Sequence, residues 1–126
     1  MRAVDTNVLV RLMTRDEARQ VAVAETFVAN GAWVPHLAVA EAAWVLASVY
    51  GRDPAAIATA IEMLLSHEHL TVQDRETVAA AVAQFRLRPR VGFSDCLMVE
   101  VARKAGHIPL GTFDRELSKI DGAQRL

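Results

Sequence analysis

The chain has 126 residues, 52% of them hydrophobic, and its 14 basic and 15 acidic residues leave a formal net charge of −1. This length and composition are typical of one globular domain that buries its own core, and they exclude a disordered chain. The balanced charge excludes a globally basic nucleic-acid-binding surface, and no apolar run approaches the roughly 18 residues that indicate a membrane span.

The N-terminal half of the chain is predicted to alternate short strands with helices. An apolar strand over 2–5 runs directly into a helix over 7–13, with Thr6 and Asn7 at the junction. Further on, hydrophobic periodicity and the capping and breaking residues predict a helix over 17–30 capped by Asp16, a strand over 32–35, a helix over 37–50 and a helix over 54–66.

The helix predicted over 37–50 is apolar on every face apart from Glu41 and Ser48. Such a helix is expected to be buried on more than one side. We therefore expect Trp44 and Tyr50 to lie in the core or at a dimer contact rather than to serve as platforms for base stacking.

The C-terminal half of the chain continues the alternation. The same signals predict a strand over 70–72, a helix over 75–87 capped by Asp74, a helix over 95–105, a strand over 107–111 and a short helix over 114–118. Strands that alternate with helices in this way form right-handed βαβ units. We therefore expect a single α/β domain over 1–126, with a central, mostly parallel sheet of four or five strands covered on both faces.

Four carboxylates fall at positions that such a sheet brings to one edge. Asp5 and Asp114 directly follow strands, Asp95 lies at a helix start, and Glu41 lies near the start of the long helix. Ligands of an open parallel sheet bind at this carboxyl edge of the strands. Carboxylates gathered there raise one another's pKa because their negative charges repel, and a divalent cation bound between them neutralises this repulsion.

The oxygen ligands suit Mg²⁺ or Mn²⁺, because no histidine or second cysteine is placed to favour zinc. Such a metal can activate a water for attack on a phosphodiester. Thr6, Asn7 and Thr112 are placed to orient ligands or water around the carboxylates.

Each acid also has a simpler structural interpretation. Asp5, Asp95 and Asp114 could each cap the helix that follows, a role compatible with metal binding. Glu41 could reach solvent near the N-terminus of its helix, where the helix dipole favours a negative charge. Cys96 lacks a histidine at a suggestive spacing, so we expect a small buried residue in a reducing, cytoplasmic protein.

Four short motifs occur in order along the chain: Val4-Asp5-Thr6-Asn7-Val8-Leu9, Ala38-Val39-Ala40-Glu41-Ala42, Ser94-Asp95-Cys96-Leu97 and Gly111-Thr112-Phe113-Asp114. Together they resemble the PIN-domain ribonucleases over nearly the whole chain. The small size resembles the toxins of bacterial VapBC toxin–antitoxin pairs.

The resemblance implies a three-layer α/β/α sandwich and an endoribonuclease that depends on Mg²⁺ or Mn²⁺. It implies that Asp5, Glu41, Asp95 and Asp114 hold the metal, with Thr6, Asn7 and Thr112 as polar supports. It further implies an RNA substrate, a homodimer and an inhibitory antitoxin protein.

A basic loop precedes the helix that carries Asp95. Its side chains Arg86, Arg88 and Arg90 are candidates to hold the RNA backbone, although such a loop is most often simply solvated.

Two other classes of function stay open. A PIN-like module that binds RNA or protein without cutting is one, although all four acids are present. A receiver-type phosphoacceptor domain is the other, and it matches poorly because Asp5 has no acidic neighbour and Lys104 falls inside a helix. A haloacid-dehalogenase-like phosphatase is excluded, since it needs a second aspartate where Asn7 stands.

Overall fold

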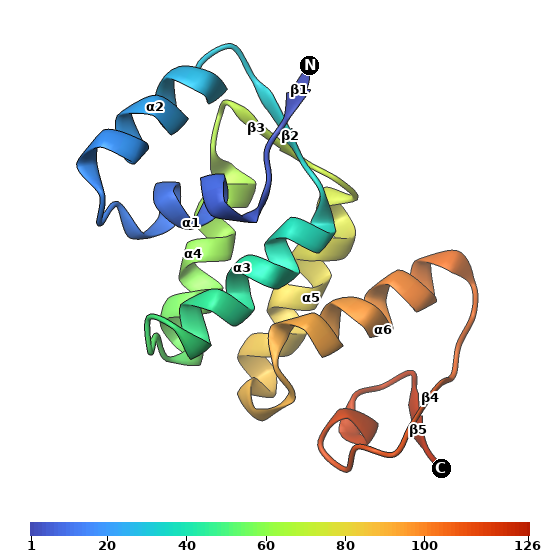
Figure 1. Cartoon of the computed structure of the whole chain (residues 1–126). Helices are drawn as coiled ribbons and strands as arrows, with labels where there is room; N and C mark the ends of the chain where they lie inside the picture. The colour runs from blue at the N-terminus through green and yellow to red at the C-terminus, as the bar shows by residue number, and fades with distance from the viewer.

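The computed structural model describes all 126 residues, and its elements follow the predicted alternation of strands and helices (Figure 1). In chain order the elements are β1 (Arg2–Ala3), α1 (Thr6–Thr14), α2 (Ala18–Val28), β2 (Ala32–Val34), α3 (His36–Ser48), α4 (Pro54–Ser66), β3 (Leu70–Val72), α5 (Arg75–Leu87), the 3₁₀ helix η1 (Pro89–Val91), α6 (Phe93–Ala105), β4 (Leu110–Thr112), the 3₁₀ helix η2 (Leu117–Lys119) and β5 (Ala123–Arg125).

All five strands pair in parallel, but they divide into two sheets. The first sheet has the order β1-β2-β3, with Arg2 opposite Ala32 and Trp33 opposite Thr71. The second contains only β4 and β5. The predicted α/β class is confirmed, with parallel strands and six α-helices consistent with a three-layer α/β/α fold. The expected single sheet of four or five strands is wrong.

The strands divide because the C-terminal segment pairs with itself. The Leu110 amide donates to the Gly122 carbonyl at 2.8 Å, and the Leu126 amide donates to the Thr112 carbonyl at 2.9 Å. β5 therefore occupies one edge of β4, and no strand pairs with the outer edge of β1. In Figure 1 the β4–β5 pair and β1 lie at opposite ends of the molecule.

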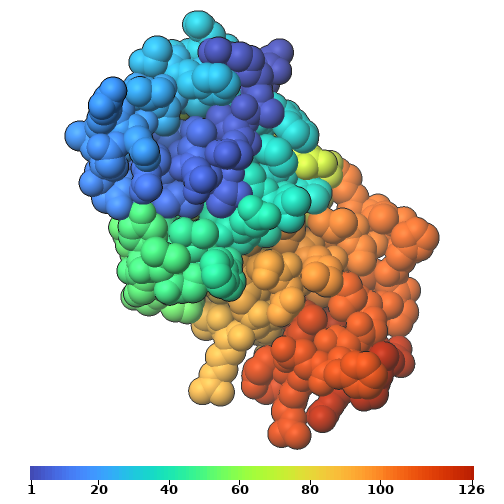
Figure 2. Space-filling view, in the orientation of Figure 1, coloured from blue at the N-terminus to red at the C-terminus, as the bar shows by residue number.

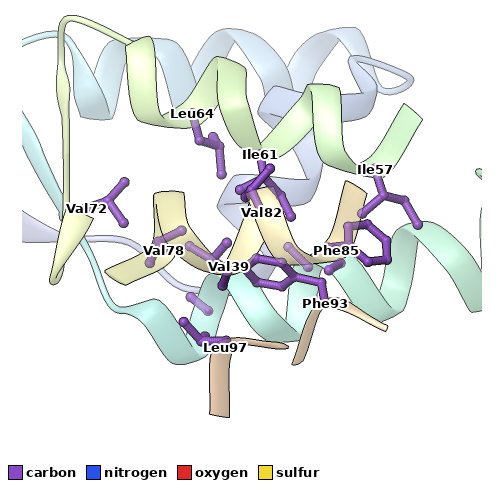
Figure 3. Packing of buried hydrophobic residues seen from close by; sticks show 14 of the residues in the cluster. Val39, Ile57, Ile61, Leu64, Val72, Val78, Val82, Phe85, Phe93 and Leu97 are labelled. Atoms are coloured by element: carbon purple, nitrogen blue, oxygen red, sulfur yellow. The ribbon is translucent and has the colours of Figure 1, made fainter. Parts of the chain in front are cut away.

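One hydrophobic core joins the helices to the first sheet. Figure 3 shows side chains from α3, α4, α5 and α6 meeting in it, among them Val39, Ile61, Val82 and Phe93. The rings of Phe85 and Phe93 contact edge to face, with centroids 6.2 Å apart. No side chain caps the first turn of α6, and the buried Phe93 packs the start of this helix, which carries Asp95, into the core.

Helix α3 is buried on more than one side, as its apolar sequence predicts, because it packs against α1, α4 and α6. It ends two residues earlier than predicted, at Ser48. No helix of the structure combines the length and the hydropathy needed to cross a membrane.

The prediction that Asp16 caps α2 is wrong, because Glu17 accepts the capping hydrogen bond from the Gln20 amide. Asp16 instead accepts hydrogen bonds from the hydroxyls of Thr14 and Tyr50, at 2.8 Å and 2.9 Å, and from Arg11 at 3.1 Å. Tyr50 therefore ties the end of α3 to the end of α1 and is not a free aromatic surface.

Two basic residues of α6 bind the helix to its neighbours. Lys104 pairs with Asp74 at 2.7 Å, which joins α6 to the start of α5. Arg103 pairs with the largely buried Glu100 and donates to the carbonyl of Asp121. The second contact holds the C-terminal segment against α6.

Candidate functional site

Asp5 and Glu41 lie on one groove of about 480 Å³, whose lining residues are Asp5, Thr6, Asn7, Glu41, Trp44 and Val45. We call it the Glu41 groove. The Thr6 hydroxyl donates a 2.6 Å hydrogen bond to Glu41 Oε2, which fixes the glutamate of α3 against the first turn of α1. Asp5 caps α1, because its Oδ1 accepts from the Val8 amide at 3.1 Å. Its other carboxylate oxygen makes no protein hydrogen bond and stays available to a ligand.

A second groove, of about 880 Å³, borders Asp5 and Asn7 on the side of α2. Val23, Ala24 and Phe27 of α2 form an apolar wall of this groove, across from the residues that follow β1. Asp5 and Asn7 line both this groove and the Glu41 groove, so they stand where the two meet. A ligand in either groove can therefore reach the Asp5 carboxylate.

Asp95 and Asp114 form a second pair of carboxylates. Asp95 lies in the first turn of α6, which begins at Phe93 rather than at the predicted residue 95. Asp114 follows β4, and its backbone amide donates to the Thr112 hydroxyl at 3.0 Å. Asp114 Oδ1 accepts from the amides of Glu116 and Leu117 and so organises the turn before η2, but the N-cap position of η2 is Glu116, so the predicted helix start at Asp114 is wrong.

Burial and the nearby charge of Asp114 raise the pKa of Asp95 above its ordinary value. Burial is the larger cause, since removing water disfavours the charged carboxylate. Asp95 is therefore a carboxyl group whose ionised form lacks a compensating cation within the protein. A bound divalent cation would supply that compensation.

The structure does not gather all four carboxylates into one cluster. No three acidic, histidine or cysteine side chains come together as a metal-binding group. The Asp5–Glu41 pair belongs to the N-terminal half, and the Asp95–Asp114 pair belongs to the C-terminal half. In the face shown in Figure 2, the surface of α3 lies between the blue N-terminal and the orange C-terminal segments. The donor chemistry fits Mg²⁺ or Mn²⁺ in each pair, but a shared site needs the two pairs to approach.

The three arginines of the predicted basic loop differ in their contacts. Arg86 pairs with Glu62 at 2.7 Å and donates to the Thr59 hydroxyl, so its charge is already neutralised by a carboxylate of the protein. The side chains of Arg88 and Arg90 are exposed and make no ion pair or hydrogen bond. Only these two keep a free guanidinium for a phosphate.

Cys96 is buried, as predicted. Burial and the nearby charges of Asp95 and Glu100 raise the pKa of its thiol to about 12. A thiol with this pKa is not a nucleophile at neutral pH, because the thiolate is the reactive form.

Trp44 lines the site, and its exposure is not predicted from the apolar pattern of α3. The residue is 67% exposed, so of the two predicted positions the core is wrong and the dimer contact stays a prediction. A signal for this exposure is present, since Glu41, Trp44 and Ser48 share one face of α3. Glu41 and Ser48 mark the solvent-facing stripe of the helix.

A model of one protein family, described as the PIN domain, matches residues 2–123 of the chain. This match spans both carboxylate pairs. No curated protein and no solved structure matches the chain.

Proposed function

The chain belongs to the PIN domain family, whose members are generally metal-dependent nucleases, and from this premise we propose that it is an endoribonuclease acting through Asp5, Glu41, Asp95 and Asp114. The family match carries the proposal. The order and spacing of the four carboxylates along the chain support it.

Each residue has a role that follows from its contacts. Thr6 orients the Glu41 carboxylate toward the groove it shares with Asp5. Asp114 and Asp95 supply a second pair of oxygen ligands, and Thr112 holds the backbone at Asp114. Mg²⁺ or Mn²⁺ bound to these oxygens would activate a water and stabilise the charge that develops on the phosphate. Asn7, which lines the same groove, is placed to orient that water or the substrate.

We propose that the two carboxylate pairs act as one site. The segment that carries Asp114 must then move toward α1, and the outer edge of β1 has no strand in its way. Spin labels on the exposed positions Val23 and Arg115 report this distance, since Cys96 is buried and does not react. Mg²⁺ is expected to shorten the distance. An unchanged distance with metal bound would mean that the pairs work separately.

Cleavage is tested with single-stranded RNA and Mg²⁺ or Mn²⁺, comparing wild type with Asp5→Asn and Asp95→Asn. Both variants keep side-chain size and lose a charged ligand, so we expect cleavage to fall by at least about 100-fold. Asp121→Asn is the control, because this acid belongs to neither pair. Full cleavage by either site variant would contradict the proposed role of these carboxylates.

The finer assignment is a toxin of a toxin–antitoxin pair that acts in the cytoplasm as a homodimer and is held inactive by a cognate antitoxin. Its support is the resemblance of the four motifs and the small size of the chain. Growth arrest on induction of the wild-type chain, absent for Asp95→Asn, is the expected result.

A non-catalytic RNA- or protein-binding module is the second candidate. The separation of the two carboxylate pairs favours it. RNA binding by wild type without cleavage in either metal would establish this alternative.

A further inference from the structure

Two grooves of the surface meet at the side chain of Trp44. One is the Glu41 groove, which Trp44 lines together with Asp5 and Glu41. The other, of about 230 Å³, is lined by Trp44, Arg52, Pro89 and Ser94 among others, and we call it the Ser94 groove. Because Ser94 directly precedes Asp95, Trp44 stands between a groove with the first carboxylate pair and a groove beside the second.

Trp44 is 67% exposed although it belongs to a helix that packs against three others. A single exposed apolar side chain is ordinary on a protein surface, so it is the position of Trp44 between the two grooves that indicates a binding role. Glu41 and Ser48 lie on the same exposed face of α3 as the indole, and so does Leu37.

A second copy of the chain is a poor occupant of this face. A protein that covered Trp44 would also cover Glu41, which lies one turn earlier and lines the same groove. No cationic side chain lines the Glu41 groove, so two facing copies would bury carboxylates without partners. Burying an unpaired charge is strongly unfavourable.

The Ser94 groove has the opposite charge character. Arg52 lines it, and Arg88 and Arg90 flank Pro89 in the turn that forms its wall. None of these three side chains makes an ion pair or a side-chain hydrogen bond within the protein. Arg52 in this groove, with the exposed Arg88 and Arg90 next to Pro89 in its wall, supplies free cationic groups of the kind that the phosphates of a single strand need.

We propose that Trp44 stacks on one nucleobase of a single-stranded RNA, while Arg52, Arg88 and Arg90 hold the phosphates on the side of the Ser94 groove. The inference rests on the proposed function and names the form of its substrate. Stacking is tolerant of sequence because every base has a π-face, so Trp44 would select unpaired RNA over duplex RNA rather than one base over another.

Binding is measured by anisotropy of a labelled single-stranded RNA of mixed sequence, with Mg²⁺, in an Asp95→Asn background that binds but does not cut. We expect Trp44→Ala to weaken binding by about 5- to 150-fold, the range measured for loss of one stacking side chain. Trp44→Phe should keep most of the affinity, and Trp44→Leu should not. Leu37→Ala is the matched control, because Leu37 is exposed on the same helix and lines neither groove.

Fluorescence gives a direct readout of stacking. Trp33→Phe leaves Trp44 as the only tryptophan of the chain, and single-stranded RNA should quench its emission while the same sequence as a duplex should not. Binding by Trp44→Ala within twofold of its parent, full recovery by Trp44→Leu, or absence of quenching overturns the proposal. So does a change from dimer to monomer in light scattering on Trp44→Ala, which would make Trp44 a subunit contact. Cleavage by Asp95→Asn overturns the proposed function instead, and the quenching result is independent of it.

Discussion

The hydroxyl of Thr6 donates a 2.6 Å hydrogen bond to Glu41 Oε2, which joins the first turn of α1 to the middle of α3. The contact links residues that are 35 positions apart in the chain. It fixes one carboxylate oxygen of Glu41 and leaves the other for a ligand. Thr6 therefore sets the orientation of a proposed metal ligand without being one.

Replacing Thr6 with valine removes this donor and keeps the shape of the side chain. We expect Thr6→Val to bind Mn²⁺ about 10- to 100-fold more weakly, as is typical when a group that orients a metal ligand is lost. Calorimetric titration with Mn²⁺ measures the change. Thr6→Ser keeps the hydroxyl and should bind like wild type, whereas wild-type affinity in Thr6→Val contradicts the role.

Neutralising Asp114 should lower the pKa of Asp95. The charge of Asp114 is the second cause of the raised pKa, and burial is the first. We therefore expect Asp114→Asn to bring the pKa of Asp95 down but to leave it above its ordinary value. A pH titration of the Asp95 carboxyl carbon by NMR gives the answer. Glu116→Gln removes a nearby charge that does not act on Asp95, so it should leave this pKa in place.

The stability of the fold should depend on Asp16 only above acidic pH. The hydroxyls of Thr14 and Tyr50 lower the pKa of Asp16 in the folded protein. Because the unfolded value is about 3.9, the carboxylate stabilises the fold above that pH, and this contribution disappears as the pH falls through the folded pKa. The melting temperature of Asp16→Asn should therefore lie below that of wild type near neutrality and converge with it as the pH falls through the lowered pKa of Asp16.

Thr14→Val provides the check on this cause. It removes the contact that lowers the pKa of Asp16 most. The loss of melting temperature caused by Asp16→Asn should therefore be smaller in a Thr14→Val background. A difference between wild type and Asp16→Asn that stays constant from pH 7 to acid would show that the ionised form is not what stabilises the fold.

Gly122 should tolerate alanine less well than Gly51 does. Both have positive φ angles, +97° and +62°, so both substitutions strain the backbone. A Cβ at Gly122 would also lie 2.8 Å from Nη2 of Arg103, whereas nothing lies within 4 Å at Gly51. We expect Gly51→Ala to cost about 1 kcal/mol and Gly122→Ala about 2–3 kcal/mol, because Arg103 must also release the Asp121 carbonyl. Equal losses in urea denaturation would contradict the role of Arg103.

The sequence predicts the order of the helices and the first four strands because periodicity and capping residues are local signals. The Asp53–Pro54 start of α4 falls at the predicted residues, since its side-chain cap is encoded next to it. The predicted cap fails for Asp16, because its carboxylate accepts a hydrogen bond from Tyr50, which lies 34 residues further along the chain. β5 was missed for a similar reason, because its three residues form a strand only by pairing with β4.

The candidate site is predictable in parts. The sequence predicts one group of four carboxylates, whereas the structure shows two pairs, Asp5 with Glu41 and Asp95 with Asp114. The rule that parallel strands deliver side chains to one edge also predicts that the pairs meet. It fails here because β4 pairs with β5 and not with β1. The exposure of Trp44 depends on which helices cover α3, which local pattern does not encode.

The first sheet has a consequence for the synthesis of the chain. Its strands pair in the order in which a ribosome makes them, β1 with β2 and then β2 with β3. β1 and β2 can therefore meet early, but one core joins the helices of both halves, so the fold is completed only when α5 and α6 have been made. The segment of Asp114 is held to α6 by the contact of Arg103 with the Asp121 carbonyl, so it joins the fold later still. A site that needs both carboxylate pairs is therefore assembled only after α6 and the segment that follows it have been made.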